Sequence, residues 1–195
     1  MDMPEIISEI ISEPEKGFSE ILLHPRPLFF SILIVLVSLF CQSVAVLLLE
    51  NYTMVQAASL LSIGFFSKLF AFSVFWILIT SLFHFIASWH KTAGNINNLF
   101  ILFGASLLPL IFLPATAIIT RGLGAGGHFL YLLIYLFIII WIFSLQVKSL
   151  KVIYNLQTAK AVSVYVIPFI SLFLLLVIST IILIALTVMM ISGTF

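Results

Sequence analysis

Five long apolar stretches, nearly free of charged residues, constrain what this chain can fold into. Each has roughly 20 or more mostly apolar residues, the length an α-helix needs to cross the hydrocarbon core of a bilayer. Because backbone amides and carbonyls inside lipid need internal partners, these stretches are expected to be helices. The prediction is an all-α, polytopic integral membrane bundle of five transmembrane helices. The predicted spans are residues 28–49, 63–88, 99–119, 129–147 and 164–191.

The composition excludes several classes of protein. Of the 195 residues, 63% are apolar and 8% are charged, whereas soluble domains are near half apolar and a quarter charged. A soluble enzyme, a disordered chain and a nucleic-acid-binding protein are therefore excluded, and no nucleic acid partner is expected. The single cysteine, Cys41, excludes an internal disulfide and any multi-cysteine metal site.

Basic residues outside the spans gather on one side of the predicted topology. Cytoplasmic loops of membrane proteins carry an excess of Lys and Arg, so this asymmetry predicts a cytoplasmic N-terminus and an external C-terminus. Near the opposite side, Lys68 and Glu50 either pair or are solvated separately. The bases on the predicted cytoplasmic side are Lys16, Arg26, Lys91, Lys148, Lys151 and Lys160.

The first 23 residues form a distinct acidic head ahead of the membrane domain at residues 24–195. Paired isoleucines recur every four residues and predict a short amphipathic helix, which Pro14 separates from a second one. The head either packs on the basic cytoplasmic loops or remains a solvated tether. Its predicted apolar stripes are Ile6, Ile7, Ile10 and Ile11, followed by Phe18, Ile21 and Leu22. The predicted docking face consists of Lys91, Lys148, Lys151 and Lys160.

Polar residues within the first two spans line up along helix faces. At 100° per residue, those of the second span fall within an arc of about 80°. Such seams usually hold helices together by hydrogen bonds, here the first helix to the second. The alternative is a polar path leading to His84. The second-span seam is Ser73, Thr80, His84, Ser88 and Lys91, and the first-span seam is Ser31, Ser38, Gln42 and Ala45.

Prolines inside the spans predict irregular helices. Pro109 and Pro114 each remove a helix hydrogen bond and clash with the preceding turn, so the third span is expected to kink or break. Pro168 is expected to act similarly in the fifth span. Broken helices occur at transporter sites, but prolines are also common in membrane helices without that role.

No motif in the chain predicts catalysis. Residues 122–127 read GLGAGG and fit the dinucleotide-binding pattern, but no acid follows Glu50 in the sequence to hold a ribose. A flexible glycine hairpin is the better interpretation. His84 and His90 lie about 240° apart on a helix and cannot share a metal ion. No metal, cofactor or enzymatic activity is expected, since an acid is equally missing for a Ser-His-acid triad.

Four stretches resemble the Yip1-domain family of five-span membrane proteins. They are HPRP at 24–27, FHFIASWHKTAGN at 83–95, ASLLP at 105–109 followed by Pro114, and the segment 141–161. The resemblance covers nearly all of the chain from His24 on. The best-matching positions are Pro25, Asn95, Pro109, Trp141, Lys151, Tyr154 and Lys160.

The resemblance implies a non-enzymatic protein with its N-terminus inside and its C-terminus outside. Eukaryotic members are associated with Rab-type GTPases and vesicle traffic in early secretory membranes. The short N-terminal segment here indicates a member from a bacterial or archaeal cell membrane, for which a GTPase partner is not expected. The prediction is a scaffold or accessory subunit that binds another membrane protein, or a second copy, through its cytoplasmic face. The alternative is a small permease, channel or lipid-handling protein with a polar path along the second and third spans.

Overall fold

The computed structural model describes residues 3–50, 52–89 and 94–191 of the chain. Over these residues the fold is helical and contains no strand, which confirms the all-α prediction. Five of the helical segments are long and apolar enough to cross a membrane, so the chain is a multi-pass membrane protein. These spans are Pro27–Leu49, Met54–Ser88, Ile96–Arg121, Gly126–Tyr154 and Thr158–Met190.

The spans are longer than their apolar runs predicted, most clearly the second, fourth and fifth. The second begins at Met54, because α4 (Met54–Ser59), a π-helical turn (Leu60–Gly64) and α5 (Phe65–Ser88) follow one another directly. Thr53 and Gln56 form a capping box at its start. The fourth span, α8 (Ala125–Tyr154), and the fifth, α9 (Thr158–Ile191), likewise extend past the predicted limits. The helix ends contain polar residues, so the apolar runs alone do not predict the full lengths of these helices.

The third span is broken where the two prolines predicted a break. Helix α6 (Ile96–Ala105) ends before a 3-10 turn at Leu108–Phe112, and α7 (Leu113–Arg121) completes the span. Pro109 has no backbone N–H, and the chain closes a tighter turn in which the Leu110 amide donates to the Leu107 carbonyl at 2.9 Å. Pro168 behaves differently: α9 runs through it without ending, so of the expected kink or break the break does not occur.

Helix α3 (Pro27–Leu49) supplies hydroxyl groups to this broken span. Ser31 donates to the Ile101 carbonyl at 2.7 Å, and Ser38 donates to the Leu107 carbonyl at 3.0 Å. Both serines are fully buried. These two serines of the first-span seam therefore join the first helix to the third, and the expectation that they join the first to the second is wrong. The interpretation as hydrogen-bonded packing is confirmed for these two residues.

Gly104 allows α3, α5 and α6 to cross closely. A Cβ at this position would collide with Ser31 Oγ and the ring of Trp76. Trp76 in turn stacks on Phe100 with ring centroids 3.9 Å apart. The main core surrounds this crossing and continues along α8 to the start of α9.

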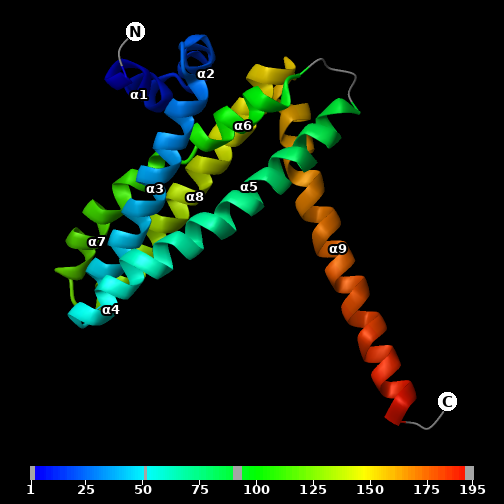
Figure 1. The fold of residues 1–195 in the computed structure, drawn as a ribbon. Helices are drawn as coiled ribbons and strands as arrows, with labels where there is room; N and C mark the ends of the chain where they lie inside the picture. The colour runs from blue at the N-terminus through cyan, green and yellow to red at the C-terminus, as the bar shows by residue number, and fades with distance from the viewer. Residues whose placement is uncertain (1–2, 51, 90–93, 192–195) are drawn as a thin grey trace.

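The arrangement of the helices separates two ends of the molecule (Figure 1). Helices α3 and α8 and the third span lie side by side, while α1 (Met3–Ser12) and α2 (Pro14–Leu23) cover one end of them. The junction of α8 and α9 and the start of α6 lie at this same end, which we call the head end. Helix α4 and the turn between α7 and α8 lie at the opposite end. Beyond its first turns α9 diverges from the bundle, and its apolar side chains are exposed there.

The crossing at Gly104 predicts a specific sensitivity to a single methyl group. Gly104→Ala should lower the free energy of unfolding by about 1–3 kcal/mol, because Trp76 and Ser31 must move to accommodate it. Gly64→Ala is the matched control, since a Cβ there makes only ordinary contacts, the nearest at 3.7 Å. Unfolding in mild detergent measures both variants. Equal stability of the two would contradict this account of the crossing.

Candidate functional site

The head packs on the membrane bundle through apolar side chains. Ile6 and Ile10 of α1 and Phe18 and Ile21 of α2 are each at most 1% exposed. They join a second core cluster with residues of α3, α6 and α8, so the docked alternative is the one that the structure contains. Ile11 is 40% exposed, which corrects the predicted stripe: of its paired isoleucines, the first of each pair faces the bundle.

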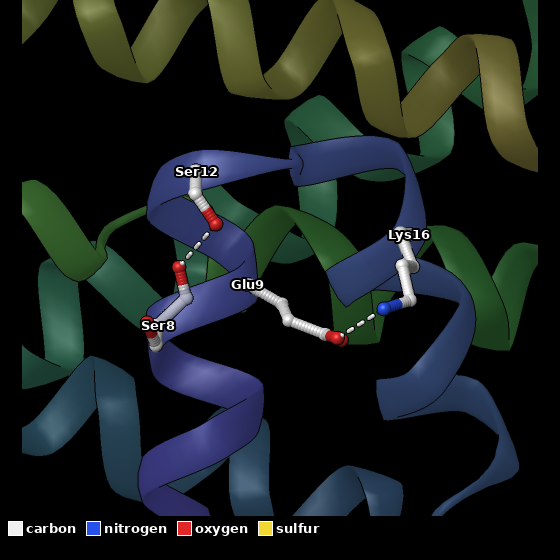
Figure 2. Close-up of polar contacts among 4 residues, drawn as sticks. All are labelled: Ser8, Glu9, Ser12 and Lys16. Carbon is white, nitrogen blue, oxygen red and sulfur yellow. Dashed lines mark hydrogen bonds and ion pairs between the residues drawn. The ribbon is translucent and has the colours of Figure 1, made fainter.

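The two head helices are held against each other at close range. A Cβ on Gly17 would lie 2.6 Å from the backbone nitrogen of Ile10, so only glycine fits there. Lys16 of α2 pairs with Glu9 of α1 at 2.5 Å (Figure 2). In the same view Ser12 donates to the carbonyl of Ser8 at 3.0 Å. The Glu9 carboxylate raises the pKa of Lys16 above its usual 10.5, so the pair persists until strongly alkaline pH.

One ion pair connects the head to the predicted docking face. Lys151 of α8 contacts Glu15 of α2 at 2.6 Å, with the two side chains 35% and 48% exposed. Ion pairs this exposed typically contribute between zero and about 1 kcal/mol. Burial of the four apolar side chains therefore contributes most of the free energy of head docking. The ion pair adds a specific contact between α2 and α8.

The remaining lysines of the docking face have different surroundings. Lys148 lines a shallow hollow beside the head with Glu13, Glu15 and Lys16. Lys160 lies exposed in the first turn of α9, near the head end. Lys91 lies outside the described residues. The structure thus brings Lys148 and Lys151 together beside the head.

The second-span seam does not act as one unit. Ser73 and Ser88 donate to carbonyls of their own helix, those of Leu69 and Phe85. Thr80 is buried, and its hydroxyl has no hydrogen-bond partner among the described residues. Lys91, the last member of this seam, lies outside the described part of the chain. An apolar hollow between α3 and α5 reaches Ser73 and none of the other described seam residues.

His84 is the seam residue that connects two spans. Its Nδ1 lies 2.5 Å from the hydroxyl of Tyr154, in the last turn of α8. Tyr154 is fully buried, and a Cβ on Gly94 would collide with its ring. The sequence pattern does not predict this contact. A tyrosine at the end of an apolar run is typical of the membrane interface, and the pattern does not show which helix it contacts. The turn that follows requires Asn155 in the left-handed region, at φ 49°.

Other polar groups also stabilise contacts between helices. Lys68 donates to the hydroxyl of Ser43 at 3.1 Å, and among the described residues it forms no ion pair with Glu50. The Gln42 amide donates to the Tyr135 hydroxyl at 3.2 Å and joins α3 to α8.

In the turn between α7 and α8, Gly124 has φ 61°, a conformation suited to glycine, as a hairpin of this kind requires.

Within the described ranges, no three His, Cys, Asp or Glu side chains are grouped to hold a metal ion. Comparisons with protein-family models, with curated proteins and with solved structures give no match for this chain. The geometry of the head end is therefore the basis for the function proposed below.

Apolar docking predicts how the head responds to substitution. Phe18→Ala removes a fully buried ring, a change that costs about 3–5 kcal/mol in a core. It should raise the rate of tryptic cleavage after Lys16 tenfold or more, because a released α2 unfolds. Leu23→Ala is the matched control, since Leu23 is 78% exposed on the same helix. Limited proteolysis in lipid nanodiscs provides the comparison, and unchanged cleavage of Phe18→Ala would show that the head is held in another way.

Proposed function

We propose that this protein is a non-enzymatic membrane scaffold or accessory subunit that binds another membrane protein through its head end. The observation that carries the proposal is the packed head, which turns this end of the bundle into a continuous surface. Lys160 is exposed beside it, and Lys148 lies at its margin. A fixed surface that carries an exposed lysine provides geometry and a charged group for a partner.

The proposed orientation places this surface in the cytoplasm. The head end carries five of the eight basic residues, Lys16, Arg26, Lys148, Lys151 and Lys160. The positive-inside tendency of short loops favours a cytoplasmic location for such an end. This orientation agrees with the resemblance to the Yip1-domain family, and a bacterial or archaeal cell membrane is the proposed location. No GTPase contact is part of the proposal.

The polar groups inside the bundle support a scaffold more than a permeation path. Ser31 and Ser38 are occupied by carbonyls of the third span, and His84 by Tyr154. A path for a polar solute needs side chains that are free to contact it. Here the hydroxyl of Ser38 on α3 donates to the Leu107 carbonyl at the break in the third span.

Charge reversal at the head end tests the proposal. The full chain is purified in mild detergent from its own cells, with Lys160→Glu compared against the unaltered protein. Lys160→Glu should lower recovery of a stoichiometric membrane-protein partner severalfold, because it reverses the charge of an exposed side chain on this surface. Met54→Glu is the control: it introduces the same side chain at the opposite end, where Met54 is 92% exposed.

Two results would overturn the scaffold. One is equal loss of the partner with both variants, which would place the contact elsewhere. The other is solute flux into proteoliposomes that contain only this protein, which would favour the permease.

A further inference from the structure

A groove between α8 and α9 opens at the head end of the bundle. Its volume is about 580 Å³, within the range of sites that bind small molecules. Lys148 and Thr158 lie where the two helices approach their junction, and the remaining wall is almost entirely apolar. The apolar wall includes Phe143 and Val147 on α8, and Val162 and Val166 on α9.

The floor of this groove is held by contacts outside it. Tyr165 lines the groove and donates from its hydroxyl to Gln146 Oε1 at 2.6 Å, which ties α9 to α8. Its ring stacks on Phe83 of α5, with centroids 4.9 Å apart and planes at 11°. Three helices therefore fix the separation of the walls, so the groove is preformed. Farther from the head end α9 diverges from the bundle (Figure 1), which leaves the groove open toward the lipid.

Lys148 gives the groove a charged end. Its side chain lies between the head and the groove, because it lines both hollows. Among the described residues no carboxylate pairs with it, and the nearby Glu15 is occupied by Lys151. From position 148 to Ile140, the farthest lining residue on α8, the groove extends about 12 Å along the helix at 1.5 Å per residue. A cation at the interface followed by an apolar channel is complementary to an anionic phospholipid.

We infer that the α8–α9 groove binds one anionic phospholipid. The Lys148 ammonium contacts the phosphate, the Thr158 hydroxyl is available as a second donor, and an acyl chain lies along the walls toward Phe169. Basic residues near the bilayer surface favour anionic lipids in this way. This site is separate from the proposed partner surface at Lys160 and does not depend on it.

The binding is tested on the full-length protein by native mass spectrometry after addition of phosphatidylglycerol or phosphatidylcholine. The unaltered protein should retain one phosphatidylglycerol in preference to phosphatidylcholine. Lys148→Gln should weaken phosphatidylglycerol binding about fivefold, the effect of one basic residue at an anionic surface. Lys160→Gln removes the same charge outside the groove and should leave it unchanged.

A second pair of variants tests the apolar channel. Val166→Trp fills the groove and should reduce retention of both lipids, whereas Ile182→Trp, on the exposed far part of α9, should not. Soluble glycerol phosphate in excess should fail to displace the lipid, because it lacks the acyl chains. Equal effects of Lys148→Gln and Lys160→Gln, no effect of Val166→Trp, or displacement by glycerol phosphate would each overturn the proposal.

Discussion

The need to satisfy backbone groups inside a bilayer is the constraint on which the rest of this structure depends. Pro109 interrupts the third span, where water cannot solvate exposed backbone groups. At this break Ser38 donates to the Leu107 carbonyl beside the Leu110 amide, and earlier in the same span Ser31 donates to the Ile101 carbonyl of α6. That requirement places α3 directly against the broken span, with Gly104 allowing the close approach. The other helices pack around this centre.

The head completes the same assembly at one end. Its buried isoleucines and Phe18 cover apolar side chains of α3, α6 and α8 that would otherwise face the interface. The acidic residues determine little of the binding energy, because the Glu15–Lys151 pair is half exposed. Two of them, Glu9 and Glu15, form ion pairs with Lys16 and Lys151. Lys160 and Lys148 take part in neither of these pairs, and the partner surface is proposed at Lys160 and the lipid groove at Lys148.

Features encoded locally could be predicted from the sequence, whereas features that depend on neighbours could not. The five spans, the two head helices separated by Pro14 and the break at Pro109 follow from apolar runs and proline chemistry, and the structure contains them all. The partner of the α3 serines could not be predicted, because periodicity shows which face is polar and not which helix covers it. For the same reason periodicity places His84 on a polar helix face but does not predict its contact with Tyr154. The groove between α8 and α9 left no pattern, because its wall is as apolar as a lipid-facing surface.

A double-mutant cycle between Ser38 and Pro109 tests the central claim most directly. Free energies of unfolding in mild detergent are compared for Ser38→Ala, Pro109→Ala and the pair. In the unaltered background Ser38→Ala should cost about 1 kcal/mol, because the Leu107 carbonyl loses its hydroxyl donor. In the Pro109→Ala background most of that cost should disappear, because a regular helix turns the Leu107 carbonyl along the helix axis, toward the Ile111 amide and away from Ser38. Costs that add to within about 0.5 kcal/mol would contradict the claim that α3 is held where it is by the broken span.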